Sequence, residues 1–76
     1  MLREGDVRNT IAEAVPAVDT AKIDVDTEFD QLGIDSLDFS AILLALQEQY
    51  GLVVPDEDLE QVNSIGKILA YAARSK

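Results

Sequence analysis

The 76-residue chain contains no cysteine, no histidine and no tryptophan, and it has only six lysine and arginine residues. The absence of cysteine excludes disulfides and thiolate metal sites, and it suits a reducing cytoplasm, where we expect the protein to act. The absence of histidine removes the base that most often activates a serine nucleophile. The longest unbroken apolar run covers only residues 41–46, and the first ten residues lack the apolar stretch of a signal peptide, so we expect no membrane span.

Positive charge is scarce and is placed near the two ends of the chain. Between Lys22 and Lys67 there is no lysine or arginine, whereas eleven aspartates and glutamates fall in that stretch, and the formal net charge is −9. Such a surface repels nucleic acid and anionic lipid, so we expect neither as a partner. It attracts basic protein surfaces and speeds their encounter. The acidic stretch surrounds an apolar run, which favours a face that docks onto proteins with basic patches.

The apolar periodicity predicts an all-α fold, a small antiparallel bundle of three main helices plus one short helix. The first helix is expected over residues 2–15 and is ended by Pro16. A long loop follows over residues 16–35, which we expect to be pinned to the core by its apolar residues, Ile23, Phe29 and Leu32. We expect residues 1–76 to form a single domain and to remain monomeric.

The second helix is predicted from about Leu37 to Tyr50, with Asp35 as its N-cap and Asp38 three residues on. A short third helix is expected over residues 56–61. The last helix is expected to begin after Asn63 or Ser64 and to reach Arg74, with Gly66 as a weak point near its start.

The second helix is apolar on more than one face. One stripe is the expected core contact and consists of Phe39, Ile42, Leu43, Leu46 and Tyr50. A second stripe follows spacings of four and three residues and consists of Leu37, Ala41, Leu44 and Glu48. A bundle this small cannot cover both stripes, so we predict that the second stripe is a docking strip, flanked by Asp35 and Asp38.

The segment "LGIDSLDFSAILLALQEQYGLVVP" resembles the central segment of an acyl carrier protein, and the similarity extends over nearly the whole chain. This resemblance implies a carrier without catalytic residues of its own rather than an enzyme. It implies that a phosphopantetheinyl transferase moves 4′-phosphopantetheine from coenzyme A onto Ser36, between Asp35 and Leu37. The docking residues for acyl-transferring or acyl-modifying synthases and ligases are then Asp35, Leu37, Asp38, Ala41, Leu44 and Glu48.

Several departures from the family pattern bear on the pathway. Ala41 and Gln47 stand where carriers of general fatty-acid synthesis usually have acids, which favours a dedicated carrier with its own ligase or synthase. The resemblance leaves open whether the carrier serves fatty acid, polyketide or other specialised acyl biosynthesis. An aminoacyl carrier serving its own ligase is an alternative, as is an acidic helical interaction module without a covalent arm. Phe39 is bulky for a position near the arm, although core packing also accounts for it.

A calcium site is the remaining alternative. Five acids occupy positions 1, 3, 5, 7 and 12 of an EF-hand-like spacing, namely Asp24, Asp26, Glu28, Asp30 and Asp35. Position 6 is Phe29, where that loop needs glycine, and position 12 is aspartate rather than glutamate. We therefore expect an acidic loop and no metal site.

Overall fold

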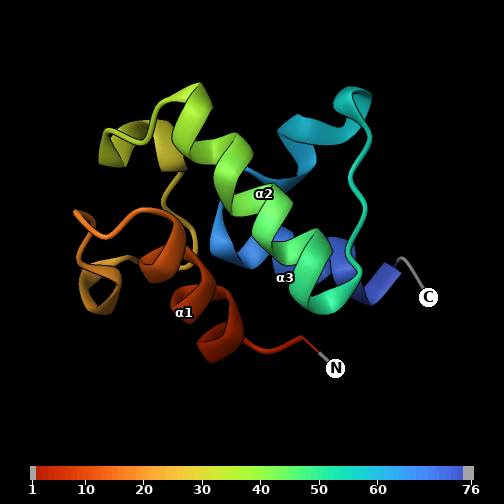
Figure 1. Cartoon of the computed structure of the whole chain (residues 1–76), viewed down its shortest axis with the longest axis horizontal. Coiled ribbons are helices and arrows are strands. Elements are labelled where there is room, and N and C mark those ends of the chain that lie inside the picture. The colour runs from red at the N-terminus through yellow and green to blue at the C-terminus, as the bar shows by residue number, and fades with distance from the viewer. Residues whose placement is uncertain (1, 75–76) are drawn as a thin grey trace.

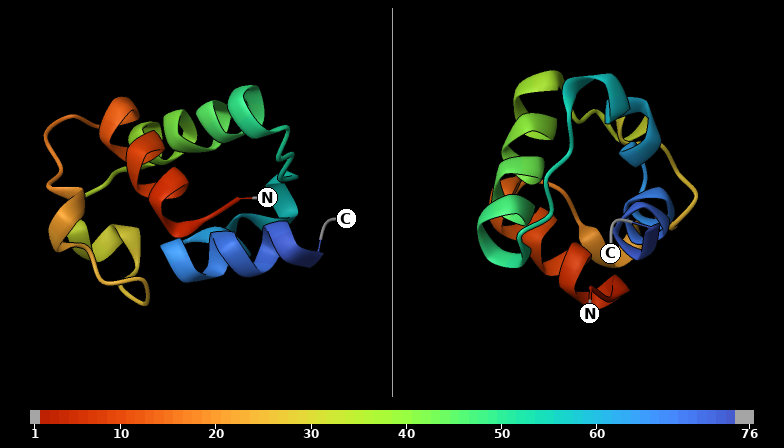
Figure 2. Two further views of the ribbon diagram at one scale, coloured as in Figure 1. Left: turned by 90° about the horizontal axis from the view of Figure 1, so that it is seen from below. Right: turned by 90° about the vertical axis from the view of Figure 1, so that its right-hand side faces the viewer.

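The computed structural model describes residues 2–74, and within that range the chain is entirely helical and irregular, with no strand. It contains three α-helices, α1 (Glu4–Ala14), α2 (Ser36–Tyr50) and α3 (Ile65–Arg74), and three 3₁₀ segments, η1 (Thr20–Lys22), η2 (Phe29–Leu32) and η3 (Asp56–Val62). The all-α prediction is confirmed, and the short third helix is η3. The chain runs along α1 against the direction of α2 and α3 (Figures 1 and 2).

The core is formed where the inward stripes of the three α-helices meet. Among the described residues, seven aliphatic side chains have no exposed surface. One is Val62 of η3, and the other six come in pairs from α1, α2 and α3: Val7 and Ile11, Ile42 and Leu46, Ile65 and Ile68. Their spacings of three and four residues are those of one helix face. Tyr50 is 43% exposed, so its predicted place in the core stripe is wrong. Leu46 is the last fully buried residue of α2, and the final turn of that helix extends past the packed interior.

The long connection between α1 and α2 lies against the bundle, as predicted from its apolar residues. Ile23 and Phe29 are almost fully buried, and Leu32 is half-buried against the core. Arg8 of α1 donates one hydrogen bond to Glu4, at 2.9 Å, and another to the carbonyl of Thr20 at the start of η1. These contacts hold the loop in a defined path and so position the residues just before α2.

Two backbone hydrogen bonds tie the same loop to the start of α3. The Phe29 N–H donates to the carbonyl of Asn63 at 2.9 Å, and the Gly66 N–H donates to the carbonyl of Val25 at 2.8 Å. A β-carbon added at Gly66 would lie only 3.1 Å from that same carbonyl oxygen. Gly66 therefore permits a close approach of two backbones, and the weakness expected from its helix propensity is the smaller part of its role.

The segment η3 is fastened to α3 by side chains. The Tyr71 hydroxyl donates to Asp58 at 2.7 Å, and Arg74 donates to Gln61 at 3.0 Å while its guanidinium lies 5.6 Å from the centre of the Tyr71 ring. The hydrogen bond to the Asp58 carboxylate raises the pKa of Tyr71 above the ordinary value of 10.0, and partial burial raises it further. The neutral phenol is therefore the form that the fold prefers.

The hydrogen bond from Tyr71 to Asp58 should make the stability difference between the wild type and a Tyr71→Phe variant depend on pH. Because the folded pKa is the higher one, the contribution of Tyr71 is complete below pH 10 and is lost as pH rises through the raised value. Tyr71→Phe should therefore lower the melting temperature at pH 7, and the difference from wild type should vanish in strongly alkaline solution. The matched control is Tyr50→Phe, which removes an exposed hydroxyl and should change nothing. Equal melting temperatures for wild type and Tyr71→Phe at pH 7 would contradict this role.

Candidate functional site

The N-terminus of α2 is fixed by two neighbouring local features. Gly33 has a φ of 79°, in the left-handed region that glycine adopts readily, and this conformation ends η2 and turns the chain toward α2. Asp35 is the N-cap, as predicted, and its carboxylate accepts a hydrogen bond from the Asp38 N–H at 2.9 Å. Its carbonyl accepts the first intrahelical bond, from the Phe39 N–H at 2.9 Å.

Ser36 is the first residue of α2, and its side chain is exposed. Among the described residues its hydroxyl makes no hydrogen bond. The N–H groups of Ser36 and Leu37 precede the first intrahelical hydrogen bond, so they face outward at the positive end of the helix dipole. This environment suits a phosphodiester on the serine oxygen, because an anion there meets free N–H donors. The acidic neighbours oppose such an anion, and one of them, Asp35, has a structural role as the cap of α2.

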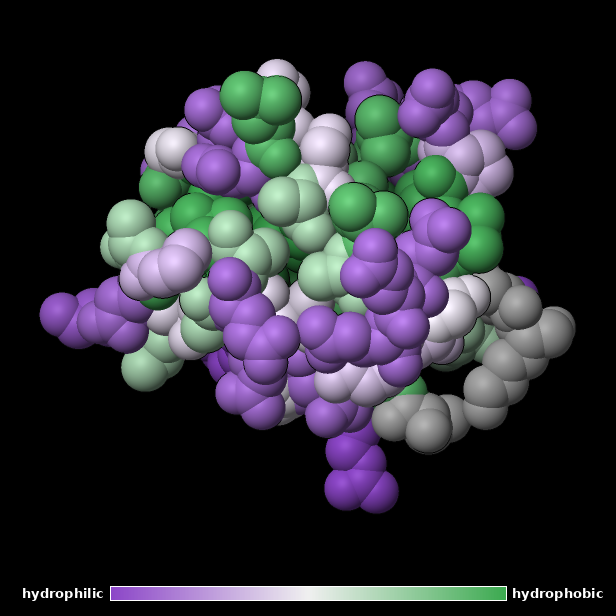
Figure 3. All heavy atoms as spheres, viewed as in Figure 1, coloured by the Kyte–Doolittle hydropathy of each residue, from purple (hydrophilic) through white to green (hydrophobic). Residues whose placement is uncertain are grey.

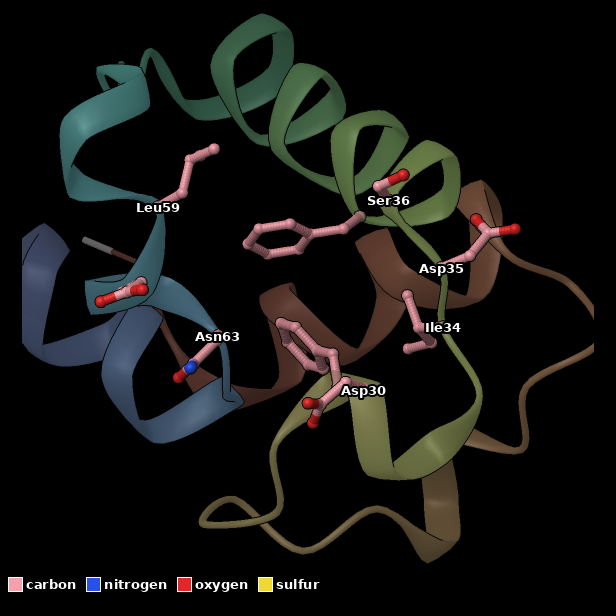
Figure 4. A pocket seen from close by; sticks show the side chains of 9 residues that line it. Asp30, Ile34, Asp35, Ser36, Leu59 and Asn63 are labelled. Atoms are coloured by element: carbon pink, nitrogen blue, oxygen red, sulfur yellow. The ribbon is translucent and has the colours of Figure 1, made fainter.

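A hollow of about 260 Å³ opens beside Ser36 (Figure 4). Its apolar wall brings together residues from three segments, and these are Phe29, Ile34, Phe39 and Leu59. Ile34 and Leu59 extend toward it from opposite sides, whereas the carboxylate of Asp35 points away from it. The remaining lining residues are polar: Asp30, Asp35, Ser36, Glu60 and Asn63. The exposed serine thus stands at the edge of a small apolar space.

Asn63 joins the wall of this hollow to the long loop. Its side-chain amide donates to Glu28 at 3.0 Å, and its backbone carbonyl accepts from Phe29. Its Oδ1 is buried and has no hydrogen-bond donor among the described residues. This oxygen is therefore a buried polar atom without a hydrogen bond, which is an uncommon state.

The predicted strip on α2 is exposed along its length. Leu37 is 80% exposed and Leu44 is 55% exposed, and Ala41 and Glu48 are exposed as well. Asp35 is exposed and Asp38 is half-buried at the same end of the helix. In the face shown in Figure 3, hydrophobic side chains gather near the start of α2 and beside the segment that follows it, with hydrophilic side chains between. The structure thus leaves an uncovered apolar strip that begins at Ser36.

Within residues 2–74 no group of three or more acidic side chains is placed to hold a metal ion. Three of the five acidic side chains of the calcium-like spacing instead serve local structure. Asp24 accepts from the Asp26 N–H at 3.1 Å, Glu28 accepts from Asn63, and Asp35 caps α2. In the described part of the chain, no helix is long and apolar enough to span a membrane.

Four residues of the hollow were not predicted from the sequence to lie near Ser36, and these are Ile34, Leu59, Glu60 and Asn63, of which Asn63 was considered only as a helix cap. Ile34 is buried, with 5% of its surface exposed, and its position between Gly33 and the N-cap is a signal that could have indicated an apolar anchor. Leu59 and Asn63 come from the other side of the molecule, about 25 residues away along the chain, and no local pattern places them beside Ser36.

Comparisons with known proteins agree with this geometry. The family model described as the phosphopantetheine attachment site matches residues 6–72. The acyl carrier protein of Clostridium acetobutylicum is 36% identical over 66 residues, which cover 86% of this chain and 84% of that protein. The acyl carrier protein of Helicobacter pylori strain G27 is 36% identical, and that of Helicobacter acinonychis is 35% identical, each over 72 residues covering 93% of this chain and 91% of the relative.

The fold and the matches define a small helical carrier that holds a covalent 4′-phosphopantetheine group and is not itself an enzyme. The chain belongs to the acyl carrier protein family. When bound, the prosthetic group supplies a thiol on which acyl groups are carried as thioesters. The absence of histidine and cysteine from this chain is consistent with this role, because the thiol comes from the prosthetic group and the chain provides the attachment point and a surface.

Proposed function

We propose that Ser36 is the residue that carries the 4′-phosphopantetheine arm. The observation that supports this most strongly is an exposed hydroxyl without a hydrogen bond, at the first position of a capped helix and beside an apolar hollow. Ser64 is 3% exposed and its hydroxyl accepts from the Lys67 N–H, so it is unavailable. Ser40 is exposed but lies one turn inside α2, away from the helix end. Ser75 lies outside the described residues.

The attachment joins the Ser36 oxygen to the phosphorus of coenzyme A that bears the pantetheine. The phosphoanhydride bond breaks, 3′,5′-adenosine bisphosphate leaves, and the hydroxyl proton is taken up by a base. This chain has no histidine to act as that base. We propose that a phosphopantetheinyl transferase supplies it. The role of this chain is to present the hydroxyl clear of other contacts and to hold the helix end in place through the Asp35 cap.

Intact mass spectrometry tests the proposal that the chain is modified. Incubation with coenzyme A and a promiscuous phosphopantetheinyl transferase should add the mass of a single arm. An unchanged mass would favour the alternative of an interaction module without an arm. Supplying the loaded carrier with candidate ligases and acids would then separate acyl cargo from aminoacyl cargo.

We further propose that the exposed strip on α2 receives the partner enzymes. The strip is formed by Leu37, Ala41, Leu44 and Glu48, with Asp35 and Asp38 beside it. A partner that acts on the arm must approach this end of α2, because the arm would leave from Ser36. The apolar residues then supply contact energy and the acids steer the encounter with a basic patch.

This docking face predicts a selective loss of transfer. Leu44→Ala should lower kcat/KM with the cognate enzyme by about three- to ten-fold, because a central apolar contact is lost. Asp38→Lys should also impair transfer, because it reverses charge opposite a basic patch. Circular dichroism should show both variants folded, since Leu44 is already exposed. The matched control is Val53→Ala, another exposed aliphatic side chain outside the strip. Unchanged transfer by Leu44→Ala and Asp38→Lys would show that the strip is ordinary surface.

The neutral residues of this face support a dedicated pathway rather than general fatty-acid synthesis. Ala41 and Gln47 are both exposed, so packing in the core does not explain why these two positions carry no charge. Ala41→Glu combined with Gln47→Glu should improve recognition by an enzyme of general fatty-acid synthesis, by about two- to five-fold per new charge pair at low salt. If the double variant shows no gain with that enzyme, the neutral residues at positions 41 and 47 do not distinguish a dedicated pathway from general fatty-acid synthesis.

A further inference from the structure

Acidic and basic side chains are divided along the chain at residue 60. All 15 aspartates and glutamates lie within residues 1–60, which contain only three of the six bases. Residues 61–76 contain no acid and carry the other three bases, Lys67, Arg74 and Lys76, of which Lys76 lies outside the described residues. Helix α3 is therefore a basic element of a molecule whose formal net charge is −9.

The two bases of α3 line a groove between this helix and η3. The groove has a volume of about 400 Å³. Two residues of η3 and three of α3 line it: Glu60 and Gln61, and Lys67, Ala70 and Arg74. The three α3 residues are spaced by three and four positions, so they share one face of the helix. The helical rise places the two bases about 10 Å apart along the axis, and the small, exposed side chain of Ala70 leaves the space between them open.

Arg74 is held in place while most of its donors stay free. It donates one hydrogen bond to Gln61 at 3.0 Å, and its guanidinium lies 5.6 Å from the centre of the Tyr71 ring. A guanidinium has five N–H donors in a rigid fork that matches a carboxylate. Among the described residues neither Lys67 nor Arg74 forms an ion pair, and this includes Glu60, the one acid of the lining. The groove therefore presents two uncompensated positive charges, one of them already oriented.

The charge and the spacing together favour one kind of occupant. An anionic membrane is repelled by the 15 acids of the same small molecule. A second copy of the chain brings the same excess of negative charge, which opposes self-association. A single small anion uses the groove poorly, because the two bases stand two helix turns apart. A segment of another protein that carries two or more carboxylates fits both the charge and the spacing.

We propose that the groove between η3 and α3 binds an acidic segment of a partner protein, whose carboxylates pair with Lys67 and Arg74. This surface is distinct from the strip on α2, and its binding does not require an arm on Ser36. The strip attracts a basic surface and the groove attracts an acidic one. A partner that carries both charges in the matching arrangement is therefore held in one orientation, because the reversed orientation brings like charges together.

Titration of the isotope-labelled, unmodified chain with a hexaglutamate peptide at low salt tests this proposal by NMR. The backbone amides of residues 60–74 should shift in a saturable manner, and those of α2 should not. Lys67→Gln should weaken binding about three-fold, and Lys67→Gln combined with Arg74→Gln about ten-fold, as expected for exposed charge pairs. Ala70→Leu should also weaken binding, because it fills the groove without changing its charge. Raising the salt to about 0.15 M should weaken binding by the wild type.

The matched control variant is Lys22→Gln, which removes an exposed base outside the groove and should bind the peptide as the wild type does. A hexaglutamine peptide should cause no shifts. Unchanged binding by the Lys67 and Arg74 double variant, or equal weakening by Lys22→Gln, would overturn the proposal. It would also be overturned if inorganic phosphate, phosphatidylglycerol vesicles or the unlabelled chain itself shifted the same amides as strongly, because the occupant would then be a small anion, a membrane or a second copy.

Discussion

Ser36→Ala should abolish phosphopantetheine loading completely while leaving the fold intact. The variant removes the exposed hydroxyl that makes no hydrogen bond among the described residues, so no folded-state contact is lost. Asp35 continues to cap α2 through the Asp38 N–H, which does not involve the serine side chain. Intact mass after incubation with coenzyme A and a transferase should therefore stay at the unmodified value, and the melting temperature should remain near that of the unmodified wild type.

The matched control is Ser40→Ala. Ser40 is also exposed and lies only one turn further along α2, so the two variants remove the same group from neighbouring positions. Ser40→Ala should gain one arm as the wild type does. Loading of Ser36→Ala, or loss of loading in Ser40→Ala alone, would refute the assignment of the attachment residue.

Gly66→Val should cause the largest loss of stability among substitutions at positions that are not fully buried. A β-carbon at this position would lie 3.1 Å from the carbonyl oxygen of Val25, and the valine methyl groups extend further. That carbonyl also accepts the Gly66 N–H at 2.8 Å, so pushing the loop away weakens the hydrogen bond that holds it. We expect a loss of about 1–3 kcal/mol in the free energy of unfolding, as for other overpacked sites.

Chemical denaturation of Gly66→Val and Ala70→Val measures this effect cleanly. Ala70 is exposed on the same helix, so its replacement by valine changes helix propensity without a new contact to the loop. Valine has a higher helix propensity than glycine, so a destabilised Gly66→Val cannot be explained by propensity. If Gly66→Val is as stable as the wild type or more stable, the loop at Val25 can move away without lowering the free energy of unfolding. The close approach of the two backbones would then not contribute to stability.

Much of the α-helical framework was predictable because its signals are local. The apolar period of α1 and its end before Pro16, the cap at Asp35, and the Ser64 hydroxyl that receives the Lys67 N–H are all short-range features. The burial of Ile23 and Phe29 was likewise predictable, because large apolar side chains in a long acidic loop are stabilised by packing against the core rather than by exposure to water. The exposed face of α2 was predictable because this helix has two apolar stripes and a bundle of this size has too few helices to cover both.

The hollow and the role of Gly66 were not predictable because they depend on contacts between distant segments. Leu59 and Asn63 reach the neighbourhood of Ser36 only after η3 folds back across the bundle. Gly66 looks like a poor helix residue until the loop carbonyl of Val25 is placed against it. Tyr50 was misplaced because periodicity gives the face of a helix but not the length over which that face is packed.

Peptide mapping of the loaded wild type tests the central claim most directly. Trypsin cannot separate the candidates, because no lysine or arginine lies between Lys22 and Lys67, so one peptide contains Ser36, Ser40 and Ser64. Cleavage before aspartate places Ser36 in residues 35–37 and Ser40 in residues 38–55. The arm should appear only on the 35–37 peptide. An arm on the 38–55 peptide, or on any peptide that lacks Ser36, would contradict the account.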